Sequence, residues 1–330
     1  MSTKTNIDTD WLKAPDLWTL VRGGKTAEAI RRNRQCLVAS PIDKVGLLNA
    51  AILRGLAPEN GSELLAYRRL LTAHAESVEG WTGLGLYYRR FDNIEAAQYA
   101  FERALRLAPN HVPARYHQGI LDFYLGRLTK GWAGYEWRWQ SKRLPGSWRN
   151  FPAPVWDGKS KTEGKVLIWG EQGLGDEILF AGPALELAEA HQIVFECDPR
   201  LVALLRRDRP NLEVVPRSDP PAPRLSDSDI KSHLPVAAAC ALRRPSMQSF
   251  SASNPFLKAD QVKARALRGR FTGDRCDTPV IGPVIGLSWW SHSKFYSHRK
   301  SFMLHDLAPF LTMSNVTWVD IQYGDHAKER

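Results

Sequence analysis

A spacing of 34 residues recurs through the first half of the sequence and restricts that half to one kind of architecture. Gly85 and Gly119 are one period apart, and Pro41 and Pro109 are two periods apart. A repeat of this length is a pair of antiparallel helices, which cannot bury its apolar face alone and must stack on its neighbours. The sequence therefore predicts an α-helical solenoid of about three repeats followed by a final helix pair.

One copy of the repeat has the large and small residues of a tetratricopeptide repeat (TPR) at every key position. Small residues let the two helices approach closely, aromatic residues fill the space between pairs, and a proline ends the second helix. A stack of such repeats presents a concave groove, where we expect a protein or peptide partner to bind. The consensus positions themselves, which we expect to serve packing, are Trp81, Leu84, Gly85, Tyr88, Ala97, Phe101, Ala104 and Pro109.

Aromatic residues at spacings of three and four follow the repeats. Trp132, Tyr135 and Trp139 fall on one stripe of a helix, and we interpret this stripe as the packing surface between the last repeat and the next domain. The stretch 141–164 is rich in Pro, Gly and Lys, so we expect a linker or crossing arm there. Residues 1–140 are accordingly predicted to form the TPR domain.

The second half of the sequence alternates strand and helix patterns. A short apolar strand at 165–169 is followed by a glycine turn and a helix, and further strands are expected at 192–197 and 212–215. Such alternation predicts a parallel sheet with right-handed crossovers. We expect a first Rossmann-like lobe over 165–278 and, from another short strand near residue 283, a partial second lobe over 279–330.

The glycine turn after the first strand contains the main candidate site residues. Gly173 and Gly175 are expected to let the backbone turn with positive φ and bring a bound substrate or phosphate close to the amino end of the next helix. Asp176 heads that helix, where ligands dock in open α/β sheets, and both helix capping and catalysis favour an aspartate there. The dinucleotide-binding pattern is incomplete at Ile178, although Glu196 lies where a ribose-binding acid is expected.

Other features argue against metal, nucleic-acid and membrane functions. His292, His298 and His305 lack metal-ligand spacing with a carboxylate partner, and Asp227 and Asp229, which match a DxD metal motif, are interpreted as loop residues. The net charge of +10 favours acidic partners, but the basic residues are scattered at helical spacing, so we expect no nucleic acid. Because no apolar run approaches about 20 residues, we expect a cytoplasmic protein without a transmembrane segment.

In combination, the repeats and several later motifs resemble bacterial proteins in which TPRs precede a heptosyltransferase-like glycosyltransferase module. The resemblance covers Trp81–Asp325 and implies the GT-B architecture, with two Rossmann-like lobes, a nucleotide-sugar donor bound mainly by the second lobe, and no metal or other cofactor. The pairing of repeats with a GT-B module is also similar to the O-linked N-acetylglucosamine transferases. The motifs are GYEWRW, GEQGLGDEILFA, NPFLKAD, IGLSWWSHSK followed by RKS, and WVDIQYGD.

The resemblance implies roles for individual residues. Asp176 would be the general base that removes a proton from an acceptor hydroxyl during transfer with inversion. Lys294, Arg299 and Lys300 would neutralise the departing diphosphate, and Ser288 would offer a hydroxyl or backbone contact nearby. A solvent-exposed basic loop is the alternative interpretation of the three cationic residues.

The sequence departs from the family pattern at its end. Five residues follow Asp325, whereas the pattern continues with further strands, so we expect an incomplete second lobe. Two functions therefore remain open. One is inverting glycosyl transfer from a nucleotide sugar, with the repeats recruiting a partner or substrate. The other is a non-catalytic TPR scaffold that carries a decayed transferase module.

Overall fold

The computed structural model describes most of the chain and divides it into two compact units. One unit is His74–Lys258, and the other comprises the flanking stretches Met1–Ala73 and Ala259–Arg330. The described residues are 14–56, 63–141, 148–160, 162–250, 256–272, 282–291 and 301–325. The domain boundaries at 140, 164 and 278 remain a prediction.

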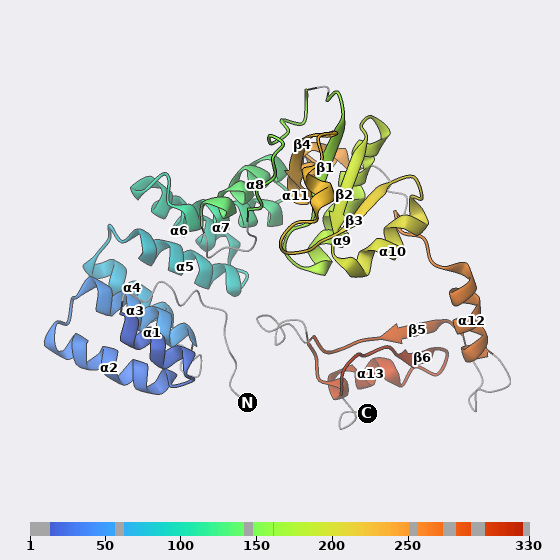
Figure 1. The fold of residues 1–330 in the computed structure, drawn as a ribbon. Coiled ribbons are helices and arrows are strands. Elements are labelled where there is room, and N and C mark those ends of the chain that lie inside the picture. Colours follow the sequence, from blue (N-terminus) through green and yellow to red (C-terminus); the bar gives the residue numbers. More distant parts are fainter. Residues whose placement is uncertain are drawn as a thin grey trace. The chain divides into compact units, whose positions relative to one another are not determined.

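Among the described residues 14–56 and 63–73, all the regular structure is helical (Figure 1). Gly24, with a φ of +77°, lies in the tight turn between the first two helices, where a residue without a side chain is least strained. Asn33 is buried and donates to the Gly46 carbonyl at 2.9 Å, which ties the second helix to the third. The helices are α1 (Pro15–Arg22), α2 (Thr26–Ala39), α3 (Lys44–Leu56) and α4 (Glu63–Ala73).

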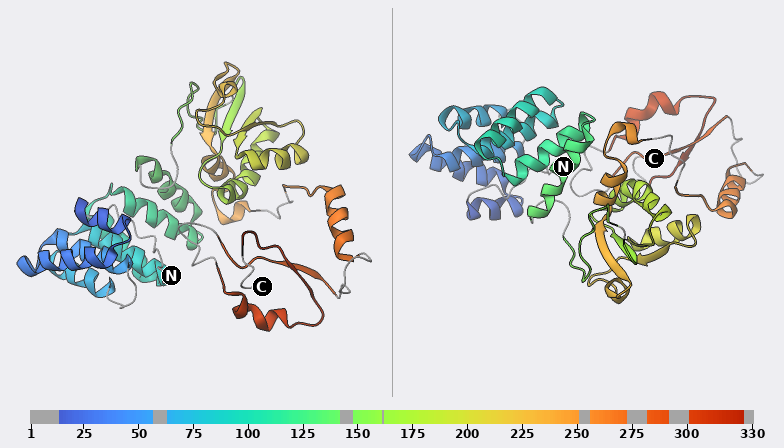
Figure 2. Two further views of the ribbon diagram at one scale, coloured as in Figure 1. Left: turned by 60° about the horizontal axis from the view of Figure 1, so that its bottom comes forward. Right: turned by 90° about the horizontal axis from the view of Figure 1, so that it is seen from above.

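The unit His74–Lys258 begins with two further helix pairs, which Figure 2 shows side by side. A side chain at Gly85 would approach the Phe101 ring to 2.5 Å, and one at Gly119 would approach the Gly134 backbone to 2.6 Å. Glycine at these positions therefore sets the close approach of the paired helices, as the repeat pattern predicts. The elements are α5 (Val78–Arg90), α6 (Ile94–Leu107), α7 (Val112–Tyr124), α8 (Leu128–Tyr135) and the 3₁₀ helix η3 (Glu136–Gln140).

A four-stranded parallel sheet follows in the same unit, with the strand order β3-β2-β1-β4. The predicted fold class, a TPR solenoid followed by a Rossmann-like sheet, is confirmed. The strands are β1 (Lys165–Trp169), β2 (Ile193–Cys197), β3 (Glu213–Pro216) and β4 (Ile230–Pro235). The helices are α9 (Leu174–Leu185), η4 (Glu186–Glu189), α10 (Pro199–Asp208), η5 (Pro223–Ser226), α11 (Val236–Arg243) and η6 (Met247–Ser249).

The two faces of this sheet are covered differently. Strand residues such as Ile168 and Phe195 pack on one face against α9, α10 and α11. On the other face, Leu167 and Trp169 pack against η5, Trp139 of η3 and the arm 148–156. The arm also pairs with the outer strand, because the Trp156 amide donates to the His233 carbonyl at 2.8 Å. The sheet is thus closed by helices on one side and by an irregular segment on the other.

The stretch after Lys258 contains a second, smaller parallel sheet (Figure 1). Its two strands pair from Val284 opposite Thr317 to Leu287 opposite Asp320. Within the described ranges, no helix is both long and apolar enough to cross a bilayer. The elements of this stretch are α12 (Gln261–Thr272), β5 (Val284–Leu287), η8 (Leu304–Leu307), α13 (Ala308–Leu311) and β6 (Thr317–Asp320).

Candidate functional site

The turn between β1 and α9 lies at the carboxyl edge of the four-stranded sheet. The positive φ expected at Gly173 and Gly175 occurs instead at Gln172, which has a φ of +60° although it has a side chain, while Gly173 has a φ of −91°. That left-handed conformation costs a residue other than glycine roughly 1–2 kcal/mol. A side chain at Gly175 would meet no atom within 4 Å, so the space beside the helix start is open. The turn therefore combines local strain with room for a ligand.

Asp176 lies in the first turn of α9 and is half-buried. Its Oδ2 accepts a hydrogen bond from the Gly173 amide at 3.2 Å, which caps the amino end of the helix. The structure thus gives the aspartate the capping role that the sequence left open. It also places a carboxylate beside exposed Gly173 and Gly175, where a hydroxyl group could reach it.

Glu171, the residue before Gln172, ties the turn to the last repeat. The side chain of Arg138, in η3, is fully buried and donates two hydrogen bonds to Glu171, at 3.0 and 3.1 Å. The guanidinium lies between two aromatic rings, 4.1 Å from the centroid of Tyr135 and 4.0 Å from that of Trp139. Burial raises the pKa of Glu171, although the neighbouring Arg138 opposes this increase. The pair is a buried bridge between the repeats and the turn.

Glu177, one residue after Asp176, forms a second buried contact. Its carboxylate pairs with Arg217 at 2.5 Å and accepts the Asp198 amide at 2.7 Å. Burial raises the pKa of Glu177. A side chain at Gly170 would come within 2.6 Å of Glu177 Oε1, so only a glycine leaves room for this carboxylate beneath the turn. The two contacts join α9 to the ends of β2 and β3.

Glu196, at the end of β2, is also buried, and it pairs with Arg149 of the arm. Burial raises its pKa as well. Arg149 donates in addition to the Ser218 carbonyl at 2.8 Å. A ribose-binding acid must present its carboxylate to a ligand, whereas Glu196 presents its carboxylate to Arg149. This arrangement argues further against the dinucleotide site that Ile178 already left incomplete.

The aromatic residues after the repeats pack on the sheet domain, but they do not form one stripe. Trp132 and Tyr135 contact Phe180 of α9 at centroid distances of 6.0 and 6.4 Å. Trp139 instead packs against Trp169 of β1 at 5.8 Å. The helix changes from α to 3₁₀ geometry after Tyr135, which turns Trp139 to a different surface. The packing role is thus observed, while the prediction of a single stripe is wrong.

The second predicted group of site residues lies largely outside the described residues. This is so for Lys294, Arg299 and Lys300. Ser288 is described, and its hydroxyl donates to Gln322 Oε1 at 3.0 Å. The same oxygen accepts the amides of the two tryptophans that follow Ser288, at 3.0 and 2.8 Å. Gln322 therefore joins the segments that leave β5 and β6, a role the sequence analysis missed.

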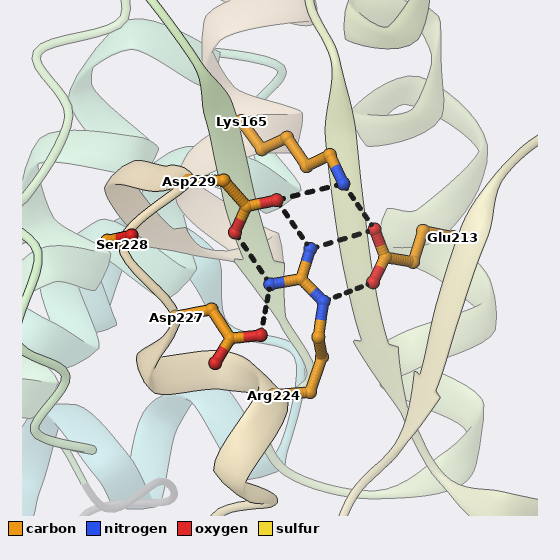
Figure 3. Close-up of a pocket in the computed structure, with 6 residues that line it drawn as sticks. All are labelled: Lys165, Glu213, Arg224, Asp227, Ser228 and Asp229. Carbon is orange, nitrogen blue, oxygen red and sulfur yellow. Dashed lines mark hydrogen bonds and ion pairs between the residues drawn. The ribbon is translucent and has the colours of Figure 1, made fainter.

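The motif Asp227-Ser-Asp229 lies at the amino edge of the sheet, in a depression that Figure 3 shows. Arg224 donates to both aspartates, at 3.2 Å to Asp227 and at 2.7 and 2.9 Å to Asp229. Lys165 pairs with Asp229 at 3.0 Å and with Glu213 at 2.9 Å. The carboxylates that a metal would need as ligands are thus already paired with the arginine and the lysine. This supports the interpretation of the motif as a loop.

Metal ligands are not gathered elsewhere in the part of the chain that the structure describes. No group of three or more His, Cys, Asp or Glu side chains there could hold a metal ion. His292 and His298, which we did not expect to be metal ligands, lie outside the described ranges. His305 is exposed, and its Nε2 lies 3.3 Å from Asp306 Oδ1.

Comparisons with known proteins find similar chains but no family model. No protein-family model matches the sequence. Among curated proteins, the chain is similar to Protein FlbA of Caulobacter vibrioides, with 24% identity over 344 residues. That match covers 88% of this chain and 57% of FlbA, so the chain spans little more than half of that relative's length.

Solved structures match about two fifths of the chain. MamA is 23% identical, with a TM-score of 0.32, over 36% of this chain and 70% of MamA. A TPR protein of Parabacteroides merdae is 17% identical, with a TM-score of 0.34, over 42% of this chain and 56% of its own. A TPR protein of Thermus thermophilus is 18% identical, with a TM-score of 0.34, over 39% of this chain and 72% of its own.

Proposed function

We propose that this chain is a glycosyltransferase-like protein whose repeats recruit a protein or peptide acceptor. The sheet domain would transfer a sugar from a nucleotide-sugar donor to an acceptor hydroxyl, with Asp176 as the general base. The observation that carries this proposal is the position of Asp176, a half-buried carboxylate beside two exposed glycines at the carboxyl edge of a parallel sheet. Open α/β sheets bind their ligands at that edge.

The charges around the turn fit a base at Asp176 better than a bound phosphate at the same place. Glu171 and Glu177 are each paired with a buried or half-buried arginine, so Asp176 is the carboxylate of this turn that lies toward solvent. A carboxylate in the first helical turn repels an anion, but it can accept a proton from a hydroxyl in hydrogen-bond reach. Gly173 and Gly175 would therefore contact a neutral part of the substrate, and the phosphates of the donor would lie elsewhere.

The donor diphosphate would be neutralised by Lys294, Arg299 and Lys300. These residues follow β5, and the two ends of their segment are joined by a hydrogen bond from the Ser291 amide to Ser301 Oγ at 2.9 Å. Basic residues that follow the carboxyl end of a parallel strand are suited to a negatively charged leaving group. Their contribution to catalysis remains part of the proposal.

The second candidate function is a non-catalytic TPR scaffold. The buried Glu–Arg pairs favour it, because each joins the turn or sheet edge to another segment and thereby stiffens a platform. In this case the groove would bind its partner and the sheet domain would serve as a docking surface. Both functions share the binding of a protein partner by the repeats.

Thermal unfolding with nucleotide sugars separates the two functions. For a transferase, UDP-, GDP-, dTDP- or ADP-linked sugars should raise the melting temperature of the purified chain, and transfer to a peptide acceptor should be detectable by mass spectrometry. Asp176→Asn should abolish transfer while the stabilisation by the sugar nucleotide persists. Asp227→Asn, which changes an exposed aspartate at the opposite edge of the sheet, is the matched control and should retain transfer. Peptide binding without any response to these donors would favour the scaffold.

A further inference from the structure

We propose that Tyr135, in the last helix of the repeats, is a positioning residue for the candidate site. It does so by holding Gln172 in its left-handed conformation. The importance of this conformation for catalysis rests on the proposed function, whereas the claim that Tyr135 holds the conformation does not. The side-chain Nε2 of Gln172 donates to the Tyr135 hydroxyl, so a residue of the repeats contacts the one described residue of the turn with a positive φ. Backbone strain of this kind persists only where surrounding contacts determine it.

Tyr135 is itself rigidly held. It is 6% exposed, its ring stacks on Tyr116 at a centroid distance of 5.8 Å, and the Arg138 guanidinium lies 4.1 Å from its ring. Burial also raises the pKa of its hydroxyl, which stays protonated. A rigid, neutral hydroxyl is a suitable anchor for a strained residue.

Two side-chain contacts connect the repeats to the turn. Arg138 holds the Glu171 carboxylate, and Tyr135 holds the next side chain, Gln172. The backbone then enters α9, where the Gly173 amide meets Asp176. The direction in which α9 begins, and with it the position of the Asp176 carboxylate, therefore depends on residues of the repeat domain as well as on the sheet-domain contacts of Glu177. The last repeat therefore contributes contacts that shape the candidate site.

Hydrogen exchange tests this inference without any ligand. We expect Tyr135→Phe, which removes only the hydroxyl, to accelerate amide exchange about tenfold in a peptide covering Gly170–Glu177. Exchange in β2, which has no contact with the hydroxyl, should stay unchanged. Tyr124→Phe makes the same chemical change at a side chain that is 72% exposed, and it should have no effect on either peptide.

A rescue experiment separates positioning from simple packing. Glycine adopts a positive φ without strain, so Gln172→Gly needs no anchor. In that background, Tyr135→Phe should cause no further acceleration. Gln172→Leu removes the hydrogen-bond donor without altering the repeats, and it should reproduce the tenfold acceleration even if Tyr135→Phe fails to fold.

Three results would overturn the inference: unchanged exchange in both single variants, equal acceleration in β2, or an undiminished effect of Tyr135→Phe beside Gln172→Gly. If the chain also transfers sugar, Tyr135→Phe should lower kcat and leave the KM for the donor unchanged. Absence of transfer in the wild-type chain would count against the proposed function alone, because the exchange measurement requires no activity.

Discussion

Replacement of Arg138 by leucine should strongly destabilise the unit His74–Lys258. Arg138 is 0% exposed and its partner Glu171 is 3% exposed, so the variant would leave an uncompensated charge inside the protein. Removing one partner of a buried ion pair typically costs about 3–5 kcal/mol. We expect a loss of that size in the free energy of unfolding, which lowers the ratio of folded to unfolded molecules by a factor of more than about 100.

The loss should depend on pH in a defined direction. Burial already raises the pKa of Glu171 above its ordinary value of 4.5, and Arg138 opposes that increase. In Arg138→Leu the opposing charge is gone, so the folded-state pKa should rise further. An acid with a raised pKa in the folded state binds its proton more tightly there, so stability falls as the pH rises from the unfolded to the folded pKa. The variant should therefore be less destabilised at pH 5 than at pH 8.

Urea unfolding followed by tryptophan fluorescence at both pH values measures this effect. The control is the double variant Arg138→Leu with Glu171→Leu, which removes both charges and should recover most of the lost stability. Recovery should fall short by about 1 kcal/mol, because the Ala237 amide, 3.2 Å from Glu171 Oε1, then has no acceptor. A single variant that loses less than about 1 kcal/mol, or a double variant no more stable than the single, would refute the reasoning.

Three further predictions concern packing, ion pairs and metal binding. Gly119→Ala should destabilise the last helix pair by about 1–3 kcal/mol in thermal unfolding, because the new methyl group would overlap the Gly134 backbone, whereas Gly175→Ala should not overlap anything; equal effects would contradict this. Glu196→Gln should lower stability by about 1–3 kcal/mol in urea unfolding by leaving Arg149 without its anionic partner, and an unchanged midpoint would show that the pair contributes nothing. Added Mn²⁺ should leave the melting temperature unchanged, because the DxD carboxylates are already paired; a metal-dependent increase would reverse that interpretation.

Local sequence patterns were sufficient to predict most of the fold. The 34-residue spacing fixed the helix pairs, since the small residues it singled out lie where helices touch. The apolar run before Gly170 predicted a strand, turn and helix, which the structure confirms as β1 and α9. The largely apolar segment Ile230–Leu242 contains both β4 and most of α11. Periodicity cannot separate a buried strand from a buried helix, so this boundary could not be predicted.

The candidate site was predicted only where its signal is local. Asp176 stands out because glycines precede it, whereas the pairing of Glu171 with Arg138 and of Glu196 with Arg149 joins residues 33 and 47 positions apart. Nothing in a single sequence reveals which arginine meets which carboxylate. An acidic residue inside an apolar strand, as at Glu196, is the one hint available, because such a residue needs a partner if it is to be buried.

The arm at 148–156 has a practical consequence for dissecting this protein. Its Trp156 is buried against the helical face of the sheet, and its Pro154 carbonyl accepts the His233 amide at 2.9 Å. A truncated protein that started at Lys165 would lack the arm, and β4 would lose the backbone partner along its outer edge. The exposed N–H and C=O groups of that edge could then pair with another copy of the protein. Any attempt to express the α/β portion by itself should therefore retain the arm, and should expect poor solubility without it.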